Sequence, residues 1–286
     1  MHPEIETPMT RREFLRKGRN WTLLAGVGLA GADALLEGHW IELRRVRIQL
    51  PSLPTAFHGL RVVHVTDTHV GGGFFDAGDL QDVIDRVNAL DPDVVCFTGD
   101  LVDDQYDRMD DIARALGTCK ARYGKYAILG NHDFRQRDQV LQAFTEGGFE
   151  ALVNRSVVIE AQGQELYIAG LDDFLKGKAD VEKAIAGIPP DRCIVLLVHE
   201  PDLADRIAQY PIALQLSGHS HGGQVRLPFY GPILTPSMGK KYVEGLFAIG
   251  SNGFQLHVSR GIGTQTLPVR FFCRPDISVL TLESVR

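Results

Sequence analysis

The stretch Gly218-His219-Ser220-His221-Gly222-Gly223-Gln224 follows an apolar run, 212–216, that has the pattern of a short buried strand. Side chains alternate along an extended segment, so His219 and His221 are expected to point into one small volume if the segment stays extended. The flanking glycines allow the backbone to turn sharply beside them. One His-x-His pair is also consistent with chance or with hydrogen-bonded core histidines, and the upstream sequence decides between these interpretations.

Four more polar clusters occur upstream, and each follows an apolar run typical of a strand. They are Asp67-Thr68-His69 after 60–66, Gly99-Asp100 after 94–98, Asn131-His132-Asp133 after 125–129, and His199 after 194–198. In α/β folds the carboxyl ends of strands carry the binding sites, so these side chains are expected to meet. Imidazoles and carboxylates together are typical ligands of transition-metal ions. Asp100 has two carboxylate oxygens and is the natural ligand to bridge two cations.

The remaining sequence predicts one α/β domain over 41–286. Helical spacing of apolar residues predicts helices over 79–90, with Asp79 as N-cap, over 109–122 and over 138–146. Strands are expected over 40–50, at an edge, over 157–161 and 165–169 as a hairpin, and over 254–258 and 277–282. Cys96 and Cys193 lie in apolar runs and are interpreted as buried.

Residues 1–40 predict an export signal or an N-terminal anchor. Arg11 and Arg12 precede a weakly apolar run, 21–36, that contains the small-residue pattern Ala30-Gly31-Ala32. This is similar to a twin-arginine signal and predicts export to the periplasm or the outer face of the membrane. Sixteen helical residues span roughly 24 Å, less than a ~30 Å bilayer core, which favours a removed signal over an anchor. A basic N-terminus followed by an amphipathic helix is the alternative.

Charge and cysteine spacing argue against a nucleic-acid-binding protein and against a zinc-ribbon or redox protein. The 286-residue chain has 23% charged residues and a net charge of −6, so no basic surface for nucleic acid is expected. The four cysteines are widely spaced and form no zinc-ribbon or redox motif.

The order Asp-x-His, Gly-Asp, Gly-Asn-His-Asp, His, Gly-His-x-His resembles the calcineurin-like metallophosphoesterase superfamily. The resemblance extends over nearly all of the chain after residue 40, including 227–231 and 258–261, and favours the exported or membrane-associated bacterial branch of YkuE- and YaeI-type phosphodiesterases. It implies a four-layer αββα sandwich, with two mixed sheets flanked by helices and the metals at the strand ends.

Carried over residue by residue, the resemblance implies two divalent ions, Mn, Fe or Zn. One ion would be bound by Asp67, His69 and His221, and the other by Asn131, His199 and His219, with Asp100 bridging both. His132 would be the catalytic histidine that protonates the leaving alkoxide, and Asp133 would orient it. A metal-bridging hydroxide would attack the phosphorus, which is consistent with two cations that offset the charge of a phosphoester.

The sequence defines the type of reaction more closely than it defines the substrate. Export favours a phosphodiester of the cell envelope or a lipid-linked one, and related branch members are UDP-2,3-diacylglucosamine pyrophosphatases of lipid A biosynthesis. Basic side chains that could bind the rest of a substrate are Arg135, Arg137, Lys240 and Lys241, each of which could equally be a solvated charge.

Three further alternatives remain open. A phosphomonoesterase would use the same ligands. An amidohydrolase also builds a two-metal site, but there the His-x-His pair comes on the first strand, whereas here it comes late. A metal-binding module without turnover would not need His132.

Overall fold

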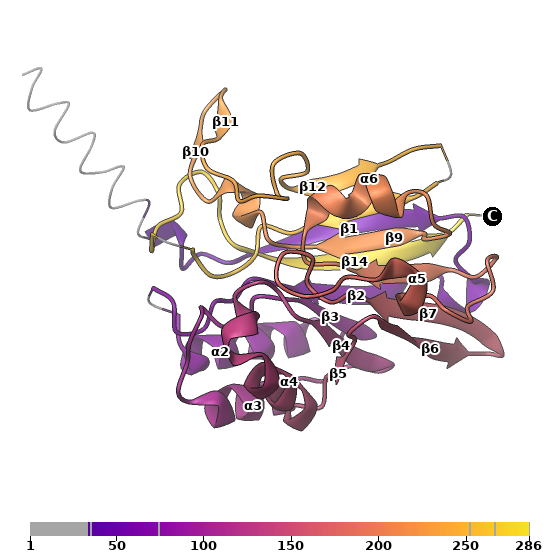
Figure 1. The fold of residues 1–286 in the computed structure, drawn as a ribbon, viewed down its shortest axis with the longest axis horizontal. Coiled ribbons are helices and arrows are strands. Elements are labelled where there is room, and N and C mark those ends of the chain that lie inside the picture. The colour runs from indigo at the N-terminus through magenta and orange to yellow at the C-terminus, as the bar shows by residue number, and fades with distance from the viewer. Residues whose placement is uncertain (1–33, 35, 74, 252, 266, 286) are drawn as a thin grey trace, which may run out of the picture.

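The computed structural model describes residue 34 and residues 36–73, 75–251, 253–265 and 267–285. Two six-stranded mixed sheets lie face to face, and helices cover the outer face of each (Figure 1). The four-layer αββα arrangement predicted from the sequence is confirmed.

The first sheet has the strand order β1-β14-β2-β3-β4-β5. β2 pairs antiparallel with β14, and the other neighbouring strands pair in parallel. Its strands are β1 (Glu42–Leu50), β14 (Asp276–Ser284), β2 (Leu60–Val65), β3 (Val94–Thr98), β4 (Gly124–Ile128) and β5 (Glu150–Ala151). β1 lies at the edge, as its alternating pattern predicts.

The second sheet has the order β12-β13-β9-β8-β7-β6, with antiparallel pairs at both ends and parallel pairs between them. Its strands are β12 (Gly245–Ala248), β13 (Gln255–Val258), β9 (Leu214–Ser217), β8 (Ile194–Leu197), β7 (Gln164–Gly170) and β6 (Arg155–Ala161). A separate small hairpin, β10 (Arg226–Leu227) with β11 (Gly231–Pro232), extends away from the body of the domain (Figure 1).

Helices occupy the two outer layers. The first sheet is covered by α2 (Ala77–Ala89), α3 (Met109–Gly117) and α4 (Arg137–Glu146), and the second by α5 (Val181–Ala184) and α6 (Ala204–Ile207). Single 3₁₀ turns lie at η1 (Thr55–Phe57), η2 (Asp133–Gln136), η3 (Pro201–Leu203) and η4 (His221–Gly223).

Three buried apolar clusters correspond to the three interfaces between these layers. Leu80 and Ile84 of α2 pack with Val63 and Val65 of β2, while Val62 faces the second sheet. A strand whose two faces are both buried is apolar throughout, which is why the runs before the polar clusters lack clean alternation. All four cysteines are free and buried.

Two helix boundaries differ from those expected. The N-cap of α2 is Asp76, whose carboxylate accepts from the backbone N–H groups of Gly78 and Asp79, and Asp79 instead completes a capping box at the third helical position. α3 ends at Gly117, five residues before the predicted end, and Thr118 follows as its C-cap.

The domain also begins earlier than residue 41. The carbonyl of Ala34 accepts from the backbone N–H of Arg270, and the Glu37 carboxylate accepts from those of Phe272 (2.7 Å) and Cys273 (2.9 Å). The predicted boundary therefore cuts through a segment that is bonded to the fold. The paired arginines and the cleavage pattern lie outside the described residues. No helix in the described part of the chain is long and apolar enough to cross a bilayer.

Candidate metal centre

The predicted ligands lie in loops that follow β2, β3, β4, β8 and β9, at one end of the two sheets. Five of them have left-handed backbone conformations, with φ between +46° and +66°: Asp67, His69, Asp100, His219 and His221. This region disfavours non-glycine residues, and such strain concentrates at functional sites.

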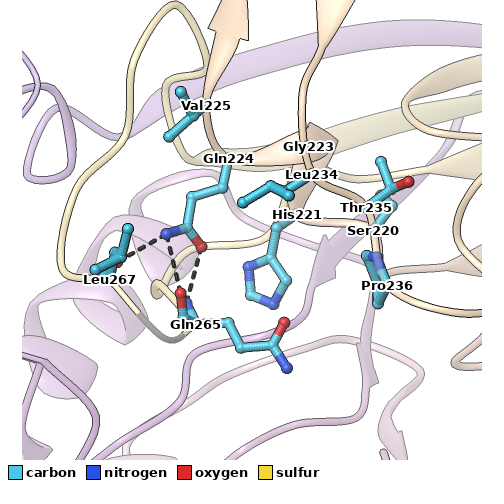
Figure 2. Close-up of a pocket in the computed structure, with 10 residues that line it drawn as sticks. All are labelled: Ser220, His221, Gly223, Gln224, Val225, Leu234, Thr235, Pro236, Gln265 and Leu267. Carbon is cyan, nitrogen blue, oxygen red and sulfur yellow. Dashed lines mark hydrogen bonds between the residues drawn. The ribbon is translucent and has the colours of Figure 1, made fainter.

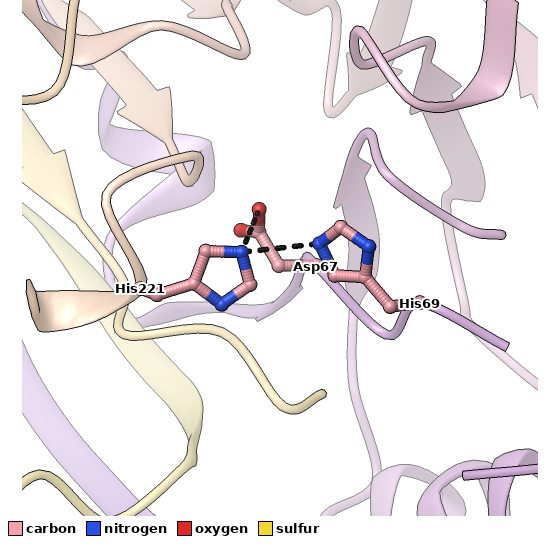
Figure 3. A group of neighbouring side chains, drawn as sticks. All are labelled: Asp67, His69 and His221. Carbon is pink, nitrogen blue, oxygen red and sulfur yellow. Dashed lines mark hydrogen bonds and ion pairs between the residues drawn. The ribbon is translucent and has the colours of Figure 1, made fainter. Parts of the chain in front are cut away.

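One cluster consists of Asp67, His69 and His221, whose ligand atoms lie within 4.8 Å of one another (Figure 3). The Nε2 atoms of His69 and His221 are 3.0 Å apart, and the Asp67 carboxylate is 3.5 Å from His221 Nε2. The three side chains are almost completely buried. They come from two loops more than 150 positions apart in the sequence.

Asp67 is fixed by its neighbours. Both carboxylate oxygens accept from the backbone N–H of His219 at 3.0 Å, and the Thr66 hydroxyl donates to Oδ2 at 2.8 Å. A Cβ atom at position 218 would lie 2.1 Å from Oδ2. Position 218 must therefore be glycine for the two loops to meet.

A second cluster consists of Asp100, His199 and His219. His199 Nε2 is 3.2 Å from Asp100 Oδ2 and 3.2 Å from His219 Nδ1. Asp100 Oδ2 also lies 3.5 Å from His69 Nε2, so this carboxylate faces both clusters, as its predicted bridging position requires.

The outer nitrogens of this second cluster show which ring atoms face inward. His199 Nδ1 donates to the carbonyl of Thr98 and His219 Nε2 to that of Ser237, each at 2.7 Å, because a carbonyl can only accept. Orientation by an outer hydrogen bond is typical of metal-ligating histidines. The inner nitrogens therefore face each other and a carboxylate, an arrangement that only a shared proton or a cation can stabilise.

When no metal ion is bound, a proton on His199 stabilises this arrangement. Burial alone lowers its pKa, but Asp100 outweighs burial and raises that pKa well above its ordinary value. Burial and the neighbouring His199 lower the pKa of His219 to about 4, so His219 keeps a free lone pair.

Asn131 adds an oxygen donor. Its Oδ1 atom is buried, and no group in the described residues donates to it. The next residue, His132, donates its backbone N–H to Asp100 Oδ1 at 2.9 Å, which ties this loop to the second cluster. A buried acceptor that receives no hydrogen bond, next to inward-facing nitrogens and carboxylates, is suited to bind a divalent ion.

The expectation that His219 and His221 share one volume is wrong. Both residues are left-handed rather than extended, and His221 begins the turn η4. Their rings consequently enter different clusters, His219 with His199 and His221 with His69. The motif supplies one histidine to each cluster.

His132 lies beside both clusters. Its ring centroid is 4.8 Å from that of His69, and its Nδ1 is 3.1 Å from Asp103 Oδ1. Burial would lower the pKa of His132, but Asp103, Asp100 and Asp104 raise it to about 9 in the metal-free chain. In the metal-free chain these carboxylates therefore favour the protonated imidazole.

Asp133 does not take the orienting position expected of it. Oδ1 accepts from the backbone N–H groups of Leu101 and Val102, and Oδ2 accepts from that of Gly130. Asp133 thereby joins two of the site's loops, whereas the carboxylate beside His132 is Asp103. The second aspartate of Gly99-Asp100-Leu101-Val102-Asp103 is the signal from which this could have been found. His69, Asp103 and His132 also form a third group of possible ligands.

Two further residues carry no sequence signal. Gln265 places its amide nitrogen 2.8 Å from His132 Nε2. Arg270 is completely buried, and its guanidinium donates to the carbonyls of Gly263, Arg260 and Gly261. It also lies 3.5 Å from the carbonyl oxygen of His221, so it organises the loop that carries this histidine.

Two of the four predicted substrate-binding cations are engaged with other groups. Lys241 is paired with Asp205 of α6 at 2.7 Å, so its ammonium is already engaged there. Arg137 lies over the ring of Phe134. Arg135 and Lys240 are exposed, and a role in substrate binding stays a prediction for them.

Beside His221 lies a cavity of about 230 Å³, into which the imidazole points (Figure 2). Gln224 and Gln265 line one side of it and hydrogen-bond to each other through the backbone of Gln265. Val225, Leu234, Pro236 and Leu267 contribute apolar surface. The cavity therefore joins a polar, histidine-rich centre to an apolar wall.

The fold and the two clusters define a metal-dependent hydrolase of phosphoesters. Residues 60–223 match the family model described as calcineurin-like phosphoesterase, and the chain belongs to this family. Its members depend on two metal ions, and the histidine–aspartate clusters offer donors fit for them.

Three relatives show how far the similarity extends. The chain is 40% identical to the protein named uncharacterized metallophosphoesterase YkuE of Bacillus subtilis, over 96% of this chain and 98% of the relative. It is 27% identical to phosphodiesterase YaeI of Escherichia coli, over 96% and 99%. It is also 27% identical to UDP-2,3-diacylglucosamine pyrophosphatase LpxG of Chlamydia muridarum, over 86% and 90%.

Proposed function

We propose that the chain is a phosphodiesterase that works at a two-cation centre on a lipid-linked or other envelope substrate. The observation that carries the proposal is the second cluster. The outer nitrogens of His199 and His219 donate to carbonyls, so two lone pairs and the Asp100 carboxylate face one point.

In this proposal Asp67, His69 and His221 hold one cation, and Asn131, His199 and His219 hold the other. Asp100 is shared, because its Oδ2 lies within 3.5 Å of both His69 and His199. Nitrogen and oxygen donors together favour Mn, Fe or Zn over Ca. When bound, such ions supply Lewis acidity toward phosphoryl oxygens and a water activated near neutral pH.

The chain's own contribution is proton delivery. His132 is the candidate general acid, since it borders both clusters and neighbouring carboxylates raise its pKa. Asp103 holds its Nδ1 side, so the Nε2 side is presented to the leaving oxygen. The side-chain amide of Gln265 lies 2.8 Å from Nε2, so a substrate oxygen that accepts this proton would have to displace it.

The substrate class rests on two supports. The relative YaeI is named a phosphodiesterase, and the cavity beside His221 has apolar walls suited to a lipid chain. Export by a twin-arginine-type signal, proposed from residues 1–40, would place the enzyme on the outer side of the membrane.

A second candidate is hydrolysis of UDP-2,3-diacylglucosamine, favoured by the similarity to LpxG. It requires the active site on the cytoplasmic face, which conflicts with export of the domain unless residues 1–40 act as an anchor instead of an export signal. Comparing purified protein on a lipid phosphodiester and on this nucleotide-linked lipid separates the candidates, because each predicts turnover of a different bond.

The reaction itself is tested with bis-p-nitrophenyl phosphate and added Mn²⁺. His132→Ala should lower kcat roughly 10²- to 10⁴-fold while metal content is retained. His58→Ala is the matched control, since His58 is exposed and bonded to Ser284. Undiminished hydrolysis by His132→Ala would remove the proposed role.

A further inference from the structure

The hairpin β10–β11 carries apolar side chains that the described residues of the chain leave exposed. Phe229 and Tyr230 at its tip are exposed, Tyr230 by 78%, and so are Leu227, Ile233, Leu234 and Leu267 around its base. We call these six residues the apolar rim. Several large apolar side chains exposed on and around one hairpin usually mark an interaction site.

The backbone of the tip is itself unfavourable for a stable soluble turn. Phe229 has φ +67°, a region that bulky residues avoid. Asn or Gly would adopt this conformation with little strain and would expose no large apolar side chain to water. The turn thus retains an exposed phenylalanine where both conformation and solvation oppose it, which points to a function for the side chain.

The apolar rim is continuous with the cavity beside the metal centre. Leu234 and Leu267 belong to both, and the buried His221 lines the same cavity (Figure 2). A lipid whose apolar chain lies at the rim would therefore place its head group at the two clusters.

The N-terminal segment joins the domain at the same place. Ala34 and Glu37 bond to residues 270–273, and Phe271 in turn pairs with Gln224 and Arg226 at the base of the hairpin. Leu36, Trp40 and Phe272 are exposed there as well. Ala34 and Leu36, the described residues of the apolar run 21–36, therefore lie on the same side of the domain as the rim, which favours a bilayer on this side.

We infer that the apolar rim docks onto a lipid bilayer, with Phe229 and Tyr230 immersed at the interface, and that a phosphoester lipid passes from the bilayer through the cavity to the metal centre. Aromatic side chains favour this interfacial position. Docking is independent of the chemistry, whereas the path of the substrate rests on the proposed phosphodiesterase function.

Docking is tested on the full chain with a fluorescent label. All four native cysteines are buried, so an environment-sensitive dye attaches selectively to Tyr230→Cys or, as control, to Val158→Cys on the outer face of β6. With phosphatidylcholine vesicles the dye at 230 should shift to the blue and brighten, and the dye at 158 should not change. This readout does not depend on whether residues 1–33 bind lipid too.

Three results would overturn docking. The dye at 230 could keep its aqueous emission while the protein sediments with vesicles. It could shift with protein concentration alone, which would mean that a second copy covers the rim. Both labels could shift together, which would indicate unfolding on the vesicles.

The path of the substrate is tested with Phe229→Asn combined with Tyr230→Ser. Loss of two interfacial aromatics should lower turnover of a long-chain phosphodiester in vesicles roughly tenfold or more, with bis-p-nitrophenyl phosphate turnover unchanged. Equal loss on both substrates, or no loss on vesicles, would contradict the inference. Failure of wild-type protein on the soluble diester would instead contradict the proposed function.

Discussion

Replacing Asp103 by Asn tests the assignment of the proton donor. Asp103 Oδ1 lies 3.1 Å from His132 Nδ1 and is the largest of the contacts that raise the pKa of this imidazole. A hydrogen bond to a charged partner contributes about 1.5–3 kcal/mol, which corresponds to roughly one to two pKa units. Asn is nearly isosteric and removes only the charge.

The sign of the effect follows from the role of His132. A general acid works only while protonated, so activity falls as the pH rises through its pKa. Asp103→Asn lowers this pKa and should move the basic limb of the pH profile of kcat about one to two units toward lower pH.

The assay is kcat for bis-p-nitrophenyl phosphate from pH 5 to 10 at saturating Mn²⁺, with metal content measured in parallel because Asp103 also lies 3.4 Å from His69. Asp104→Asn is the matched control. Asp104 is 3.4 Å from His132 but its side chain is 62% exposed, so water screens it and the limb should move much less. An unmoved limb in Asp103→Asn, with metal retained, would refute this reasoning.

Four other perturbations test the loops around the metal centre and its affinity for metal. Gly218→Ala should abolish metal retention, because the new Cβ would lie 2.1 Å from Asp67 Oδ2, whereas Gly117→Ala, in open space at the end of α3, should leave metal content unchanged. Arg270→Met should lower the free energy of unfolding by about 3–5 kcal/mol, measured by urea denaturation, because several buried carbonyls lose their donor; a loss under 1 kcal/mol would contradict its organising role. Chelation should lower the melting temperature. Because a bound cation must displace the His199 proton, apparent metal affinity by titration calorimetry should weaken as the pH falls, by up to about tenfold per unit; a pH-independent affinity would contradict this competition.

The sequence predicts the layers and the grouping of the ligands because both depend on regular patterns. Buried strands are apolar runs, and polar residues that follow them in α/β folds meet at one end of the sheets. Asp67, Asp100 and His199 each follow such a buried strand, so their positions could be predicted.

Details set by single hydrogen bonds were not predictable in the same way. Asp133 adjoins His132 in the sequence, whereas Asp103 comes from the preceding Gly-Asp loop, and only the backbone amides that occupy Asp133 show which of the two carboxylates is free for the imidazole. The left-handed conformations of His219 and His221 likewise depend on contacts with distant loops. Gln265 and Arg270 act from a segment without regular structure, where no periodicity marks them.

The most direct test of the two-cation centre is an anomalous difference map from a crystal of the Mn²⁺-loaded protein. We expect two peaks per chain, one among Asp67, His69 and His221 and one among Asp100, His199 and His219. A single peak, or a peak only in the third group of His69, Asp103 and His132, would contradict the proposed centre.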